Sequence, residues 1–117
     1  MYRSSFNKEL SGYIMLSLLA EADGDYDARE GGIIVKYIKE NFPQGSNFED
    51  AIDFLAGVPQ DKYEDELVHL AQDFYSQSTD EERTDFLRFA MKLVRADEQI
   101  AKEENMLITK LFDAWDV

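Results

Sequence analysis

The chain has 117 residues, of which 44% are hydrophobic and 13% aromatic, so it suits one folded domain and not a disordered acidic tail. Its 25 acidic and 12 basic residues give a net charge of −13, which argues against binding to nucleic acid or anionic membranes, because both need Lys and Arg. The negative charge makes cations or basic proteins the natural partners. Cysteine is absent, which excludes disulfides and thiolate metal sites.

The first predicted helix spans about residues 6–22, where apolar side chains such as Leu16, Leu19 and Ala20 recur at helical spacing. Its apolar run, residues 13–20, is far shorter than the roughly 20 residues that a membrane-spanning helix needs. We therefore expect a core helix of a cytoplasmic protein that has no membrane association.

A second helix is predicted after a Gly-Asp turn, with Asp27 and Glu30 at the spacing of a capping box. It ends near Asn41, because Pro43 limits its extension. One apolar stripe of this helix is expected to face the core: Ile33, Ile34, Tyr37 and Ile38.

A short third helix is predicted over residues 48–56, before Gly57 and Pro59. Its inward-facing side chains are expected to be Ala51, Ile52 and Leu55. A fourth helix starts near Asp61 and carries one apolar face.

A fifth helix is predicted to begin at a cap formed by Ser78 or Thr79, with Glu82 three residues after Thr79. A sixth helix carries Leu111 and Trp115 near the end of the chain. No stretch alternates with the period of a strand, so the sequence predicts an all-α domain of about six or seven helices.

An acidic motif occurs twice, each time between two apolar helices. Asp23 and Asp97 stand 74 residues apart, as do Glu30 and Glu104. The same offset aligns the apolar positions of the neighbouring helices. We therefore expect a single domain, residues 1–117, with an internal pseudo-twofold repeat in an orthogonal bundle. Its units are about residues 6–42 and 79–116, joined by linking helices at about 48–77.

These four carboxylates, Asp23, Glu30, Asp97 and Glu104, are the candidate metal ligands. A site made only of carboxylate oxygens favours Ca²⁺, Mg²⁺ or Mn²⁺ over zinc or copper. The structural alternative is that they brace two helix corners through turn and cap chemistry. That alternative explains the first copy well. It explains the second less well, because Ala101 replaces the capping Asp27 while Glu104 is retained.

The doubled Ala-Asp motif resembles the TerB-like domain family, which includes tellurite-resistance TerB proteins and the N-terminal domain of DjlA-type co-chaperones. The resemblance covers about residues 13–115. It implies an all-helical fold with internal symmetry and an acidic patch that binds metal ions. Glu98 departs from the pattern, since the family favours glycine at that position of the second corner.

No catalytic pattern is present in the sequence. The single histidine, His69, lies within a predicted helix, away from any nucleophile motif. We expect a non-enzymatic module whose acidic corner surface binds a divalent cation weakly, in a stress or tellurite-resistance type of system. The alternative is an adaptor that docks a basic protein partner without metal, its acidic motifs being purely structural.

Overall fold

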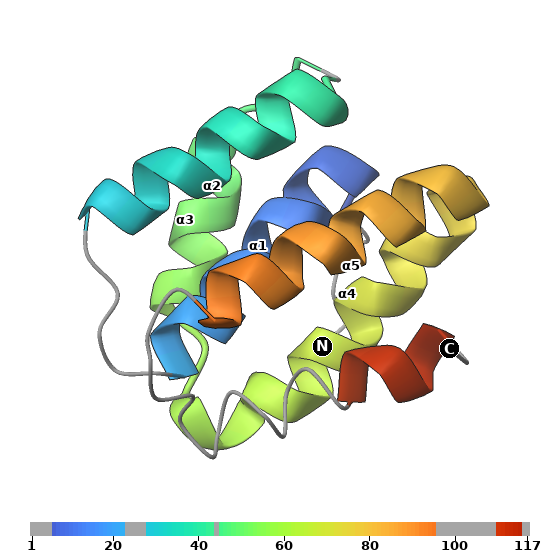
Figure 1. The fold of residues 1–117 in the computed structure, drawn as a ribbon. Coiled ribbons are helices and arrows are strands. Elements are labelled where there is room, and N and C mark those ends of the chain that lie inside the picture. Colours follow the sequence, from blue (N-terminus) through green and yellow to red (C-terminus); the bar gives the residue numbers. More distant parts are fainter. Residues whose placement is uncertain (1–5, 23–27, 44, 96–109, 116–117) are drawn as a thin grey trace.

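Helices account for nearly all of the chain that the computed structural model describes, residues 6–22, 28–43, 45–95 and 110–115 (Figure 1). The elements in chain order are α1 (Lys8–Ala22), α2 (Ala28–Asn41), α3 (Phe48–Ala56), η1 (Gln60–Lys62), α4 (Tyr63–Gln77) and α5 (Asp80–Arg95). Residues 110–115 are also helical, and none of the described residues is in a strand. The all-α prediction is confirmed.

Helix α1 forms the centre of the domain. Every side chain from Glu9 to Ala20 is buried, and α1 packs against α2, α3, α4 and α5 (Figure 1). A helix that is apolar on all sides has no preferred outer face and is stable only when it is surrounded. None of the described helices is long and apolar enough to cross a membrane.

The core is tightly packed around Gly12 of α1, where side chains of three other helices meet. A methyl group on Gly12 would lie 2.9 Å from Cδ1 of Ile38, 3.2 Å from Cε2 of Phe86 and 3.3 Å from Cε2 of Phe74. These three side chains are fully buried and come from α2, α5 and α4. Only glycine leaves room for this approach.

Helices α1 and α5 run in the same direction. In their first turns, Nζ of Lys8 lies 2.8 Å and 3.0 Å from the two carboxylate oxygens of Glu82. One turn further along each helix, Gly12 meets Phe86. Both pairs are 74 residues apart in the sequence, which is also the offset between the two acidic motifs. The two helices therefore pack side by side in the register of that offset.

Helix α4 runs antiparallel to α1. The amide of Gln77, at the end of α4, donates a 2.9 Å hydrogen bond to the carbonyl of Phe6, just before α1. The backbone N–H of Phe6 donates to a carboxylate oxygen of Asp73 at 3.5 Å. The first turn of α4 consequently lies toward the last turn of α1.

The predicted cap of α5 is confirmed. The backbone N–H of Glu82 donates to Oγ1 of Thr79 at 3.2 Å, and the N–H of Thr79 donates to Oε1 of Glu82 at 3.0 Å. These reciprocal bonds satisfy two donors that the start of a helix leaves without intrahelical partners.

Two predicted core positions are wrong. Ile33 of α2 and Ile52 of α3 are each 50% exposed. Each helix covers the core with a narrower stripe than the sequence suggests, because α1 occupies the centre and the outer helices touch it along one edge. Among the side chains of α2 that the structure describes, the fully buried ones are Ile34 and Ile38, which are one helical turn apart.

Candidate functional site

The predicted acidic site falls largely outside the described residues. This applies to Asp23, Asp97 and Glu104, and to the side chain of Glu30, whose backbone belongs to α2. The described helices nevertheless define where the two motifs begin. The first motif follows the end of α1 at Ala22, and the second follows the end of α5 at Arg95.

These two helix ends lie on the same side of the molecule. The contacts of Lys8 with Glu82 and of Gly12 with Phe86 fix the register of α1 against α5. In that register, Arg95, the last described residue of α5, is equivalent to Glu21, so the described ends of the two helices differ by one residue, or about 1.5 Å along the helix axis. Figure 1 shows both helices ending at the left of the domain.

The first turn of α4 brings further carboxylates to this end. Burial raises the pKa of Tyr63, the first residue of α4, and the negative charge of Glu21 near the end of α1 raises it further. Three acidic residues follow Tyr63 in the same turn: Glu64, Asp65 and Glu66. Acidic residues at this position also favour the helix dipole. Among the described residues, no group of three acidic or histidine side chains is arranged to hold a metal ion.

A second feature lies at the opposite end of α4, where Arg83 of α5 joins α4 to α5. Its Nη1 donates hydrogen bonds to the carbonyls of Tyr75 and Ser78, at 3.1 Å and 2.7 Å. Its guanidinium lies 3.9 Å from the centre of the Tyr75 ring, and its Nη2 bonds to the carboxylate of Asp80. Arg83 therefore satisfies carbonyls that the end of α4 leaves without intrahelical donors.

Trp115 attaches the last described helical segment to the same region. Its indole N–H donates a 2.8 Å hydrogen bond to the carbonyl of Ala71, and its ring packs against Phe74 and Phe86 at centroid distances of 5.5 Å and 5.7 Å. Only 3% of Trp115 is exposed. The last described helical segment thus contacts α4 and α5 through a buried aromatic side chain.

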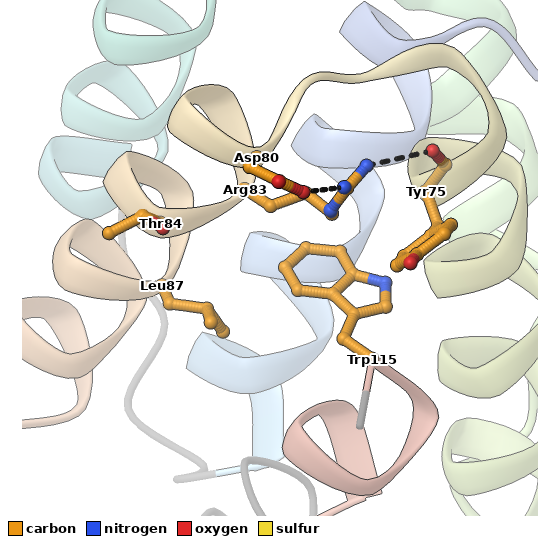
Figure 2. A pocket seen from close by; sticks show the side chains of 6 residues that line it. All are labelled: Tyr75, Asp80, Arg83, Thr84, Leu87 and Trp115. Carbon is orange, nitrogen blue, oxygen red and sulfur yellow. Dashed lines mark hydrogen bonds and ion pairs between the residues drawn. The ribbon is translucent and has the colours of Figure 1, made fainter. Parts of the chain in front are cut away.

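Two small pockets remain beside this contact. The Arg83 pocket has a volume of about 180 Å³, and Figure 2 shows its lining residues: Tyr75, Asp80, Arg83, Thr84, Leu87 and Trp115. The Gln72 pocket has a volume of about 170 Å³ and is lined by Gln72, Tyr75, Ala114 and Trp115. Tyr75 and Trp115 border both pockets.

Sequence reasoning did not find these pockets. The available signal was weak: Tyr75 lies beside the apolar stripe of its helix, next to Phe74, and a wide buried face explains such a position equally well. The structure leaves Tyr75 47% exposed, while Phe54 and Phe89 in similar positions pack against the core. His69 is exposed on α4.

The family comparison agrees with this helical domain. A model of the family described as "Tellurite resistance protein TerB" matches residues 10–117. Comparisons with curated proteins and with solved structures gave no significant match. This match covers nearly the whole chain. The protein therefore belongs to the TerB tellurite-resistance family.

Proposed function

We propose that this TerB-family module binds one divalent cation weakly at its acidic end, through Asp23, Glu30, Asp97 and Glu104. The parallel register of α1 and α5 is the observation that carries the proposal, because it starts both acidic motifs from neighbouring helix ends. Four carboxylates from two such motifs can supply one oxygen-rich site, which suits Ca²⁺, Mg²⁺ or Mn²⁺.

Retention of Glu104 also supports a cation. At the equivalent of Asp27 the second motif has Ala101, which cannot cap a helix, so capping does not account for the acidic residue three positions later. A bound ion would link the two helix corners and stabilise their packing. The net charge of −13 attracts cations to the whole surface, and the paired motifs concentrate negative charge in two short segments.

A competing proposal is that the acidic surface docks a basic protein and that the four carboxylates only brace the corners. The excess of acidic over basic residues supports this adaptor role. Such binding would weaken with added salt, because exposed charges more than about 8–10 Å apart are screened at ordinary ionic strength. A role in tellurite resistance or another stress response is compatible with either proposal.

Thermal unfolding of metal-stripped protein separates the two. A ligand that binds only the folded state at a hundredfold excess over its Kd adds about 2.7 kcal/mol of stability. Millimolar Ca²⁺, Mg²⁺ or Mn²⁺ should raise Tm beyond a NaCl control of equal ionic strength. The double variant Asp97→Asn/Glu104→Gln should lose this increase, while Glu40→Gln/Asp50→Asn, which removes two exposed carboxylates elsewhere, should keep it. An equal response in both variants would leave only the adaptor.

A further inference from the structure

The size of the two pockets beside Tyr75 indicates what they can hold. Small-molecule sites usually have volumes of about 300–1,000 Å³, and each pocket here is well below that range. A cavity of about 150 Å³ holds one benzene molecule. Each pocket therefore has room for a single apolar side chain and not for a cofactor.

Their arrangement suits a polypeptide. Tyr75, which is 47% exposed, and the buried Trp115 line both pockets. Two neighbouring pockets that share an exposed aromatic residue can each accept one side chain of a peptide. Tyrosine is enriched at the centres of protein interfaces.

Charge determines the chemistry of that peptide. Arg83 lines the Arg83 pocket, but its side chain is only 14% exposed and its charge is met by Asp80 and by the carbonyls of Tyr75 and Ser78. The side chain of Asp80 is 97% exposed, and Glu81 beside it is exposed too. Asp80 and Glu81 therefore present negative charge to solvent beside this pocket, and the Asp80 carboxylate also bonds to Arg83 (Figure 2).

We propose that this surface docks a short basic segment of a partner protein, which places apolar side chains in the two pockets and a Lys or Arg against Asp80. The surface lies at the last turns of α4, whereas the first turn of α4 lies toward the last turn of α1, after which the first acidic motif follows in the sequence, so it is separate from the proposed cation site. Net charge −13 on this chain opposes docking of a second copy or of an acidic peptide.

A random-peptide phage library selected against the full chain in EDTA tests this proposal without a cation present. We expect the selected peptides to combine Leu, Ile or Met with neighbouring Lys or Arg. Synthetic copies should change the fluorescence of Trp115, the single tryptophan of the chain. Tyr75→Ala should weaken their binding at least tenfold, and Ile52→Ala, which removes an equally exposed apolar side chain from α3, should change it less than twofold.

A second variant tests the same surface without removing a side chain that could be needed for folding. Thr84 is exposed on α5 and lines the Arg83 pocket, so Thr84→Arg should block the pocket and repel a basic peptide without disturbing the core. Failure to select any peptide would overturn the proposal, and so would selected peptides that are acidic. Peptides that bind Thr84→Arg as well as the natural chain would also contradict it.

Discussion

Gly12 of α1 and Phe86 of α5 are 74 residues apart and touch at the centre of the core, where a methyl group on Gly12 would come within 3.2 Å of the Phe86 ring. The pair of Lys8 and Glu82 repeats the same offset one turn earlier. Positions 74 residues apart thus meet twice along this helix pair. The same register leads both helices to one end of the molecule.

Gly12→Ala should destabilise the protein, because the added methyl group overfills the place where four helices meet. Overpacking of a core typically costs about 1–3 kcal/mol, against a gain of about 1 kcal/mol in helix propensity. Gly32→Ala is the matched control, since a methyl group there meets nothing within 4 Å. We expect urea unfolding to show a net loss for Gly12→Ala and a gain of about 0.5–1 kcal/mol for Gly32→Ala. A gain in both would refute the close contact.

The ion pair of Lys8 and Glu82 should make the free energy of unfolding depend on pH in the acidic range. Burial raises the pKa of Glu82, but the hydrogen bonds and charge of Lys8 and the hydrogen bonds of Thr79 outweigh it and hold the pKa below its ordinary value. A lowered pKa stabilises the folded state above the unfolded value of about 4.5, and this stability is lost as the pH falls through the folded pKa.

Lys8→Met should therefore lower the free energy of unfolding by about 0.5–1 kcal/mol at pH 7 and by less below pH 4. Lys36→Met, which removes an exposed lysine of α2, is the control and should change it little at either pH. The check is urea unfolding of the three proteins at several pH values. A pH-independent loss in Lys8→Met would mean that its aliphatic stem matters and its charge does not.

The raised pKa of Tyr37 should make the folded protein less stable at high pH. Its hydroxyl donates a 2.6 Å hydrogen bond to Asp85, and its ring stacks on Phe89 at 3.9 Å. Burial, then the hydrogen bond and charge of Asp85, raise the pKa of Tyr37 far above its ordinary value of 10. The stabilising effect is complete below pH 10 and declines as the pH rises further, because the unfolded chain ionises first.

Tyr37→Phe should cost about 1 kcal/mol at pH 7, where the hydrogen bond is lost, and should reduce the slope of stability against pH between 10 and 11. Unfolding at fixed urea concentrations across that range measures both effects. An unchanged slope would show that Tyr37 ionises as easily in the folded protein as in the unfolded one.

Trp115 should contribute strongly to stability. Trp115→Ala removes a large buried ring and should lower the free energy of unfolding by about 3–5 kcal/mol. Trp115→Phe keeps most of the ring packing but loses the hydrogen bond to Ala71, and should cost about 1 kcal/mol from that bond alone. Calorimetric unfolding of both variants tests this order. Equal losses would contradict a role for ring packing, and no loss in Trp115→Phe would contradict a role for the hydrogen bond.

Local chemistry made much of the fold predictable. The helix limits followed from caps and breakers, as at Thr79 with Glu82 and at Pro43, because these signals act within one turn. Burial was harder to predict. Ile33 and Ile52 have core-like spacing, yet they lie outside the narrow stripe that touches α1, and that stripe depends on tertiary packing.

The two candidate sites differ in the same way. The acidic motifs are visible in the sequence because each is a short continuous segment. The pockets beside Tyr75 are formed by α4, α5 and the segment that carries Trp115, so no local sequence pattern predicts them. The parallel register of α1 and α5 also depends on contacts between distant residues. Its offset of 74 residues is the same as the offset between the two acidic motifs, which can be read from the sequence.

The most direct test of the central claim is the position of a bound cation. Substoichiometric Mn²⁺ added to metal-stripped, ¹⁵N-labelled protein broadens the amide signals near the ion. We expect selective broadening of the amide signals of Glu21, Ala22 and Leu93, near the described ends of α1 and α5, and excess Ca²⁺ should reverse it. Thr79 and Gln77, at the other end of the bundle, should keep sharp signals. Broadening centred on the exposed acidic residues Glu40, Glu49 and Asp50, or none at all, would contradict it.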